Sequence, residues 1–291
     1  MSKHVMRQAG SVNGSAGFTL VEMVIVIVIT GVLAVSLALF LRPALDIYLS
    51  SSTRAALSDD ADTALRRLLR DVRSAVPNSV RIPNDQCLEL VPSTGGGRLR
   101  MGPDLVNDSG VGCTPGATCA APLDPSQPST TLDVLTPFTS LPAVGDYLVV
   151  GNQNGNDVYS GVNRAAITAL STPAATQGKH RLTIPATQFP PGFASGRFSI
   201  VSASEKAVFY VCNGGSLWRL SNYGFNAAYP SSCPSVATAS KVASGLSSCS
   251  FVYDPNPGAS AQFGYVWAQF QLTRNGESAT VTGGAHVVNA P

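Results

Sequence analysis

The sequence FTLVEMVIVIVITGVLAVSLALFL, residues 18–41, decides the fold of this chain. Glu22 is its only charged side chain, and a helix that rises about 1.5 Å per residue covers about 36 Å over this stretch. That length is sufficient for the hydrocarbon core of a bilayer, which is about 30 Å thick. A cleaved secretory signal has a shorter apolar region of about 7 to 15 residues. The stretch therefore predicts a transmembrane helix, with a plain uncleaved signal anchor as one form of it.

The residues before this helix form a short leader, residues 1–17, which contains Lys3 and Arg7 but no acidic side chain. Basic residues beside a span favour the cytoplasmic side of the membrane, which places the rest of the chain on the other side. All six cysteines lie in that outer part, at residue 87 or later. An even number of cysteines in one segment indicates disulfides in an oxidising compartment. Orientation and cysteine usage therefore agree.

The composition argues against several classes of function. Charged residues make up only 12% of the chain and the net charge is +2, so no nucleic-acid partner is expected. The sequence contains no C-x-x-C motif, no G-x-S-x-G motif and no ligand-spaced histidines. The glycine run at residues 94–98 lacks the pattern of a phosphate loop and is interpreted as a turn. We therefore expect a protein that is not an enzyme, without catalytic residues, cofactor or metal.

The junction between the leader and the span carries a recognisable motif. Gly17-Phe18-Thr19-Leu20-Val21-Glu22, followed by the apolar run, resembles the class III signal of type IV prepilins and type II secretion pseudopilins. The resemblance implies that a membrane-embedded aspartyl peptidase, the prepilin peptidase, cleaves after Gly17. It also implies that the same enzyme methylates the new amino-terminal residue, Phe18.

Glu22 has a physical cost that calls for a partner. A carboxylate in a spanning helix costs about 2.5 to 3.5 kcal/mol at the bilayer centre and less near the interface. The resemblance implies that its partner is the free Phe18 amine of an adjacent subunit, and that this pair fixes the axial register of subunits in a filament. The alternative is a solvated, interfacial Glu22 without a partner.

Residues 42–76 are predicted to continue the helix outside the membrane. Aspartates precede arginines at i,i+3 and i,i+4 spacing, which is typical of a solvated helix face. Pro43 is expected to kink the helix near the membrane exit and Pro77 to end it. A free stalk or coiled coil is the alternative, but no heptad persists over several turns. Apolar side chains recur every three or four positions and predict one buried face: Leu57, Ala61, Leu65, Leu68, Val72 and Val76.

The remaining residues, 77–291, show the period-two patterns of a β-rich head. Residues 265–273 and 279–287 alternate in this way, and Asn275-Gly276 between them predicts a hairpin with a two-residue turn. The predicted fold class is α+β: a pilin-like long N-terminal helix, transmembrane and then amphipathic, packed on a β-rich globular head. Further strands are expected at residues 87–91, 131–135, 147–150, 164–170, 181–184, 197–202, 207–212, 216–220 and 250–253.

The cysteines predict a set of disulfides in the head. Residues 107–145 are rich in Gly, Pro, Ser and Thr, which indicates an irregular excursion that a small disulfide ring would pin at its start. Six cysteines allow many pairings. The favoured ones are Cys113 with Cys119, Cys212 with Cys233 around the loop at residues 223–230, and, by elimination, Cys87 with Cys249.

Three aromatic residues of the head, Trp218, Tyr223 and Tyr229, invite two interpretations. Exposed, they would form a platform on which a sugar could stack. Packing in a core or an interface is the favoured role, because large aromatic side chains dominate both.

Further segments narrow the resemblance. Residues 62–67 and 77–81 in the helix region, and 286–291 at the carboxyl end, are similar to minor pilin-like proteins of the mannose-sensitive haemagglutinin (MSHA) pilus. The resemblance implies a subunit that initiates, assembles or caps a type IV pilus from the bacterial inner membrane, with a cytoplasmic N-terminus and a periplasmic head. Its implied partners are other pilin and minor pilin subunits, the prepilin peptidase and the inner-membrane assembly platform.

Three other functions remain open at this point. A minor pseudopilin of type II secretion would share the same amino-terminal features. A pilus-tip adhesin would bind a glycan surface through the excursion at residues 107–145 and the aromatic residues. A membrane-anchored periplasmic protein would never enter a filament.

Overall fold

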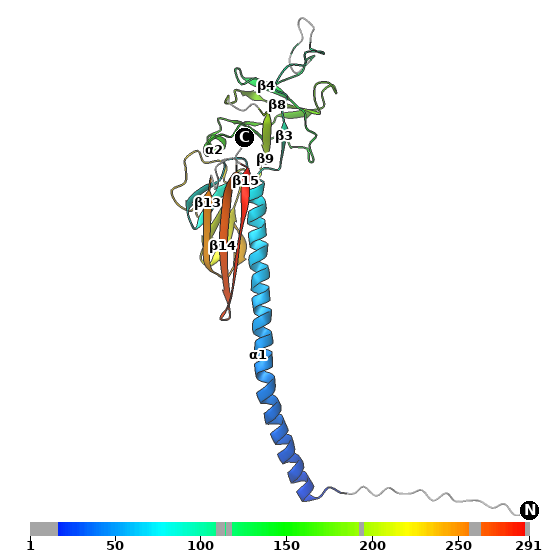
Figure 1. Cartoon of the computed structure of the whole chain (residues 1–291), viewed down its shortest axis with the longest axis vertical. Coiled ribbons are helices and arrows are strands. Elements are labelled where there is room, and N and C mark those ends of the chain that lie inside the picture. The colour runs from blue at the N-terminus through cyan, green and yellow to red at the C-terminus, as the bar shows by residue number, and fades with distance from the viewer. Residues whose placement is uncertain (1–16, 109–113, 115–117, 192–194, 256–262, 289–291) are drawn as a thin grey trace, which may run out of the picture. The chain divides into compact units, whose positions relative to one another are not determined.

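A computed structural model describes residues 17–108, 114, 118–191, 195–255 and 263–288. It has a long N-terminal helix followed by a β-rich region whose strands form four sheets (Figure 1), so the predicted α+β class is confirmed. The elements are α1 Leu20–Arg73, β1 Arg81–Asn84, β2 Cys87–Leu90, β3 Gly95–Arg98, β4 Ser129–Val134, β5 Tyr147–Val150, α2 Asp157–Ser160, β6 Arg164–Ala166, β7 Ala169–Ser171, β8 His180–Thr187, β9 Arg197–Val201, β10 Val208–Asn213, β11 Ser216–Leu220, β12 Ser240–Ser244, β13 Leu246–Asp254, β14 Phe263–Arg274 and β15 Glu277–Val288.

The chain divides into two compact units, Met1–Ser52 and Thr53–Pro291. In the first unit, α1 exposes its apolar side chains on all sides, and an 18-residue window of it has no buried residue. The helix is long and apolar enough to cross a membrane. It continues through Pro43, and the kink expected at this position stays a prediction.

The second unit is organised around the carboxyl half of α1. All six residues of the predicted apolar stripe are buried, and five of them join one core with the sheet β1-β2-β10-β11-β12 and the sheet β13-β14-β15. The helix ends at Arg73, before the expected position, because the backbone that follows pairs with another segment. Ala75 bridges to Pro92, and the Val76 amide donates to the Val91 carbonyl at 2.8 Å.

The predicted hairpin is confirmed as β14 and β15. Their register runs without a shift from Phe263 opposite Val288 to Arg274 opposite Glu277. Asn275 and Gly276 both have positive φ, 53° and 80°, which is the type I′ geometry that matches the twist of two strands. β13, β14 and β15 lie side by side along α1 (Figure 1).

A second core forms between the sheets β3-β9-β5-β6 and β4-β8-β7. The single strand expected at residues 164–170 is divided into β6 and β7, which belong to different sheets. The chain changes sheet at the two residues between them: the Ile167 amide donates to the Asp146 carbonyl on one side, and the Thr168 amide donates to the Thr183 carbonyl on the other.

The short strands β1 and β12 were not expected from the sequence, because neither carries an alternating apolar pattern.

The glycine run is a strand, β3, and its interpretation as a turn was wrong. It pairs with β9, with Gly96 opposite Ser199 and Gly97 opposite Phe198. A Cβ on Gly96 would lie 2.6 Å from the Phe198 carbonyl oxygen. The glycines therefore allow a close approach of two backbones, one of the recognised uses of glycine inside a strand.

Two of the expected disulfide pairings, Cys212 with Cys233 and Cys87 with Cys249, were wrong. The structure joins Cys87 to Cys233 and Cys212 to Cys249, with Cα–Cα distances of 5.7 and 6.3 Å. The reason is the alternation of side chains in a sheet. Cys87 lies opposite Val211 in the β2–β10 pair, so Cys212, the next residue, points to the other face.

The two faces of this sheet meet different parts of the chain. Cys87 packs with the segment that contains Cys233, and Cys212 packs in the core that contains Cys249. Cys119 is also disulfide-bonded. Its expected partner, Cys113, lies outside the described residues.

The close approach at β3 gives a stability test. Gly96→Ala should lower the free energy of unfolding by about 1 to 3 kcal/mol, because backbone must move to admit the new Cβ. Gly95→Ala is the matched control, because nothing lies within 4 Å of its Cβ position. Denaturant unfolding of both variants in detergent measures the difference, and equal stabilities would contradict the close approach.

Candidate functional site

The first candidate site is the start of α1. The amide and the hydroxyl of Thr19 both donate to Glu22 Oε2 at 3.4 Å, and the Glu22 amide donates to Thr19 Oγ1 at 3.3 Å. Gly17, Phe18 and Glu22 are all exposed, Phe18 by 78%. The Met23 amide donates to the Thr19 carbonyl, so Thr19 is the residue at which the helical hydrogen bonds begin.

This reciprocal pattern is a capping box, in which a Thr and a Glu three residues later satisfy each other's backbone donors. The carboxylate also lies at the positive end of the helix dipole. Sequence reasoning gave Glu22 a role but overlooked Thr19, although the T-x-x-E spacing of residues 19–22 is the signal that reveals it. Within one chain, Glu22 therefore has a local partner.

The apolar part of α1 also satisfies its own polar side chains. The Thr30 hydroxyl donates to the Val26 carbonyl at 2.6 Å, and the Ser36 hydroxyl donates to the Val32 carbonyl at 2.8 Å. Hydrocarbon offers no partner to a hydroxyl, so an internal acceptor is what a spanning helix requires. Glu22 is the one ionisable side chain of this stretch.

These features coincide with a known motif. Residues 12–38 match the family model of the prokaryotic N-terminal methylation motif. The match supports a type IV pilin-like chain. No curated protein and no solved structure is significantly similar to the chain.

The motif also bears on how a chain that carries it is processed and assembled. It implies processing by a prepilin peptidase and assembly with other pilins, and its family is structural, not enzymatic. With the apolar helix, it suggests a membrane-anchored single-pass protein. The pilin or pseudopilin character therefore rests on the first turns of α1 and the residues before them.

In the second unit, one acidic residue of α1, Asp71, binds two residues of the five-stranded sheet. Asp71 Oδ2 accepts hydrogen bonds from the Tyr210 hydroxyl at 2.8 Å and from Arg219 Nε at 2.9 Å. Arg219 also binds Glu205, at 2.8 Å, and burial raises the pKa of Tyr210. Because apolar contacts alone permit sliding, this directional pair sets the register of the helix on β10 and β11. Asp71 borders the apolar stripe, but the sequence gave no signal for its partners.

A second buried node lies after the end of α1. The Arg81 guanidinium, fully buried, is 3.4 Å from Glu89 Oε2 and 3.4 Å above the centre of the Tyr159 ring. It also donates to the carbonyls of Gly155, Asn226 and Ala228. The Tyr223 hydroxyl donates to Glu89 Oε1 at 2.7 Å. One arginine thus connects the chain after the helix to two loops distant in sequence.

A third node anchors the excursion at residues 107–145. Arg181 binds Asp133 through two nitrogens, at 2.7 and 3.0 Å, and donates to the Cys119 carbonyl at 3.2 Å. Asp133 in turn accepts from the Ala121 amide at 2.7 Å. Residues 119–121 of the excursion are therefore bound to β4 and β8 through this buried bidentate ion pair.

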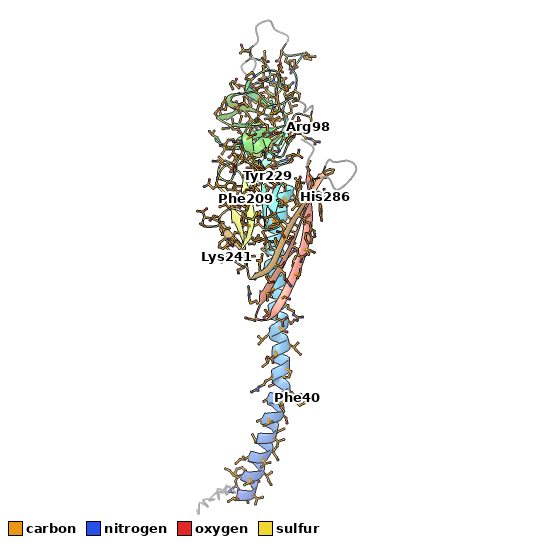
Figure 2. All side chains as sticks on the ribbon, turned by 90° about the vertical axis from the view of Figure 1, so that its left-hand side faces the viewer. Phe40, Arg98, Phe209, Tyr229, Lys241 and His286 are labelled. Atoms are coloured by element: carbon orange, nitrogen blue, oxygen red, sulfur yellow. A yellow bond between two sulfur atoms is a disulfide. The ribbon has the colours of Figure 1, made fainter. Side chains whose placement is uncertain are left out.

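Of the aromatic residues considered as a sugar platform, Trp218 and Tyr223 make contacts within the head, whereas Tyr229 is 56% exposed. Trp218 lies beside the Lys241 ammonium and donates to the Asn213 carbonyl. Tyr223 is engaged with Glu89, and the Tyr229 hydroxyl accepts from the Ile82 amide at 3.1 Å. Tyr223 and Tyr229 do line one cavity of about 410 Å³ beside Phe209, labelled with Tyr229 in Figure 2. Packing, the favoured role, describes Trp218 and Tyr223.

The histidines of the head are also engaged in packing. The ring centroid of His180 lies 4.7 Å from that of Phe138, and the centroid of the exposed His286 lies 5.0 Å from that of Tyr265, both pairs tilted. His4 lies outside the described residues. Within the ranges that the structure describes, no three His, Cys, Asp or Glu side chains gather as a metal site would require.

The Arg81 node predicts a pH dependence. Burial raises the pKa of the Glu89 carboxyl above its ordinary value of 4.5, although the Tyr223 hydroxyl and Arg81 act in the opposite direction. The folded chain therefore binds this proton more tightly than the unfolded chain, and stability from this group is lost as pH rises from about 4.5 through the raised pKa. Glu89→Gln is neutral at every pH, so its free energy of unfolding should lack this part of the decrease with pH. Tyr223→Phe removes a hydrogen bond that lowers the pKa of Glu89, so the loss of stability should move to higher pH.

Denaturant unfolding between pH 4 and 8 measures both effects. Parallel curves for the wild type and Glu89→Gln would contradict the raised pKa.

Proposed function

We propose that the chain is a minor pilin-like subunit of an MSHA-type type IV pilus, acting in initiation, assembly or at the tip. The observation that carries the proposal is the set Gly17, Phe18, Thr19 and Glu22 at the start of an apolar helix, within the matched methylation motif. The similarity of residues 62–67, 77–81 and 286–291 to the minor pilin MshO supports the MSHA-type assignment. The large head, in four sheets, supports a minor over a major subunit.

The proposal assigns a role to each part of the chain. Residues 1–17 are a leader that the prepilin peptidase removes, and Phe18 is then N-methylated. Residues 18–41 hold the subunit in the bacterial inner membrane with the N-terminus cytoplasmic. Residues 42–76 continue the helix, with Pro43 providing a kink, and residues 77–291 form a periplasmic head until the subunit passes from the assembly platform into the filament.

Glu22 has two successive partners in this proposal. In the uncleaved chain, its carboxylate accepts from Thr19. Cleavage creates a charged amine at Phe18, and the same carboxylate can then pair with that amine on an adjacent subunit. A charged donor offers a stronger hydrogen bond than a hydroxyl, so cleavage itself favours assembly.

The mature amino terminus is the direct test of processing. Mass spectrometry should find a chain that begins at N-methylated Phe18. A chain that begins at Met1, or at any other residue, would refute the pilin assignment.

Substitutions at Glu22 separate charge from capping. Glu22→Ala and Glu22→Gln should both be cleaved and methylated, yet enter sheared filaments about tenfold less than the wild type, because neither carries the charge that pairs with the amine. Thr19→Val is the control: it removes the capping hydroxyl, keeps the charge and should enter filaments normally. Quantitative mass spectrometry of filaments measures incorporation, and normal entry of Glu22→Gln would show that capping alone is the role of Glu22.

A further inference from the structure

The strand β15 leaves one whole edge of its sheet without a partner. Across the ranges that the structure describes, its backbone pairs with β14 alone. β13, the opposite edge, is covered: the Phe251 amide donates to the Asp85 carbonyl, and Gln86 donates to the Cys249 carbonyl. An uncovered edge is a template for another extended chain, and proteins usually protect it with proline, lysine or short length.

β15 has none of these protections. It spans 12 residues and contains no proline, lysine or arginine. The edge strands of the five-stranded sheet differ: β1 contains Pro83, and β12 is five residues long and carries Lys241. Length and composition therefore distinguish β15 from these two edge strands.

The register shows which backbone groups point outward. A two-residue turn makes Arg274 and Glu277 a hydrogen-bonded pair, and such pairs recur at every second residue. The odd-numbered residues of β15 therefore bond to β14. The even-numbered residues direct their N–H and C=O groups away from it: Ser278, Thr280, Thr282, Gly284, His286 and Val288.

Beside this edge, α1 carries a groove of about 570 Å³ lined by Arg66, Leu69, Arg70, Arg73 and Ser74. Leu69 belongs to both features, because a Cβ on Gly283 of β15 would lie 3.5 Å from Leu69 Cδ1. Successive residues on a helix are about 100° apart around its axis. Arg73, Arg66 and Arg70 therefore lie about 40°, 60° and 100° from Leu69, on the side away from Leu65.

The dimensions fit one additional strand. On a helix of radius about 5 to 6 Å, an arc of 40° to 60° is about 4 to 6 Å, close to the strand spacing of about 4.8 Å. A strand added to β15 would therefore lie over this groove. Its helix-facing side chains would meet Leu69 and the arginines.

The charges of the groove define the chemistry of that strand. Three arginines line it and no acidic residue does. Arg66 is bound to Asp62 at 2.6 Å, whereas in the described part of the chain Arg70 and Arg73 have no ion-pair partner within 4.0 Å. A second copy of β15 is a poor match, because its only carboxylate is Glu277 at its first position, and two copies would bring arginines together.

We propose that an extended segment of a different filament subunit, with acidic side chains at alternate positions, adds to β15 as a fourth strand of the sheet β13-β14-β15. Its backbone pairs with the outward groups of the even-numbered residues, and its carboxylates bind Arg70 and Arg73. This inference rests on the proposed function, since it places the partner in the same filament.

The first test uses the outward backbone at Thr282. Thr282→Pro removes an outward N–H without removing a bond to β14, so it should reduce entry into sheared filaments at least about tenfold. Thr282→Val keeps the N–H and should enter normally. Both variants should still be processed to a chain that begins at methylated Phe18. Absence of that processing would refute the proposed function and not the added strand. Normal entry of Thr282→Pro would overturn the added strand.

The second test uses defined peptides and the purified full chain in detergent. A blocked nine-residue peptide that alternates Thr and Glu should bind, and one that alternates Thr and Lys should bind at least about tenfold more weakly. The double variant Arg70→Glu/Arg73→Glu should reverse this preference, whereas Arg67→Glu, about 100° from Arg66 and outside the groove, should not. Equal binding of both peptides, or dimers of the chain that Thr282→Pro abolishes, would overturn the proposed partner.

Residue-resolved hydrogen exchange reads out the geometry itself. With the Thr-Glu peptide bound, amides of the even-numbered residues within the nine positions of 278–288 that it covers should become protected. The odd-numbered amides should already be protected without peptide. Protection that does not alternate would rule out strand addition even if the peptide binds.

Discussion

The burial of one face of α1 is the constraint on which the rest of the head depends. Leu57, Leu65, Leu68 and Val72 have almost no exposed surface, and the core around them contains strands from two separate sheets. Neither sheet could cover its apolar face alone, because a sheet needs a second layer against it. The helix is that layer for both. Apolar burial alone does not fix the position of the helix along its axis. The hydrogen bonds from Tyr210 and Arg219 to Asp71 fix the helix relative to β10 and β11.

The side chains of α1 make different kinds of interaction in its amino-terminal and carboxyl-terminal parts. Near Leu20, Thr19 and Glu22 satisfy each other's backbone donors, and the hydroxyls of Thr30 and Ser36 donate to carbonyls of the same helix. Beyond Thr53, it is a packing element with arginines on the uncovered side. Three arginine–carboxylate nodes, partly buried at Asp71 and buried at Glu89 and Asp133, then connect the helix, the loops and the excursion. Such pairs add little net stability but penalise any arrangement that separates them.

Much of this was accessible from the sequence, where periodicity is long and uninterrupted. The stripe from Leu57 to Val76 and the hairpin around Asn275-Gly276 were predicted with their faces correct. Prediction failed where a distant backbone decides the outcome: β3 is a strand because β9 accommodates its glycines, and the chain leaves the helix after Arg73 because Val91 offers a pairing. The disulfides failed for a related reason. Cys212 and Cys233 bracket the loop at residues 223–230, but the alternation of β10 turns Cys212 away from the face on which Cys87 packs with Cys233.

The bond between Cys87 and Cys233 also determines how the head would respond to mechanical load. Tension that enters through α1 and leaves through β15 follows the shortest covalent route, which crosses this disulfide. The 146 positions that it spans in sequence are excluded from extension, which at about 3.4 Å per residue removes about 500 Å of contour length. A subunit pulled from both ends can therefore extend only the residues before Cys87 and after Cys233. The strands between residues 87 and 233 would remain within a loop closed by the disulfide even after the surrounding non-covalent contacts had ruptured.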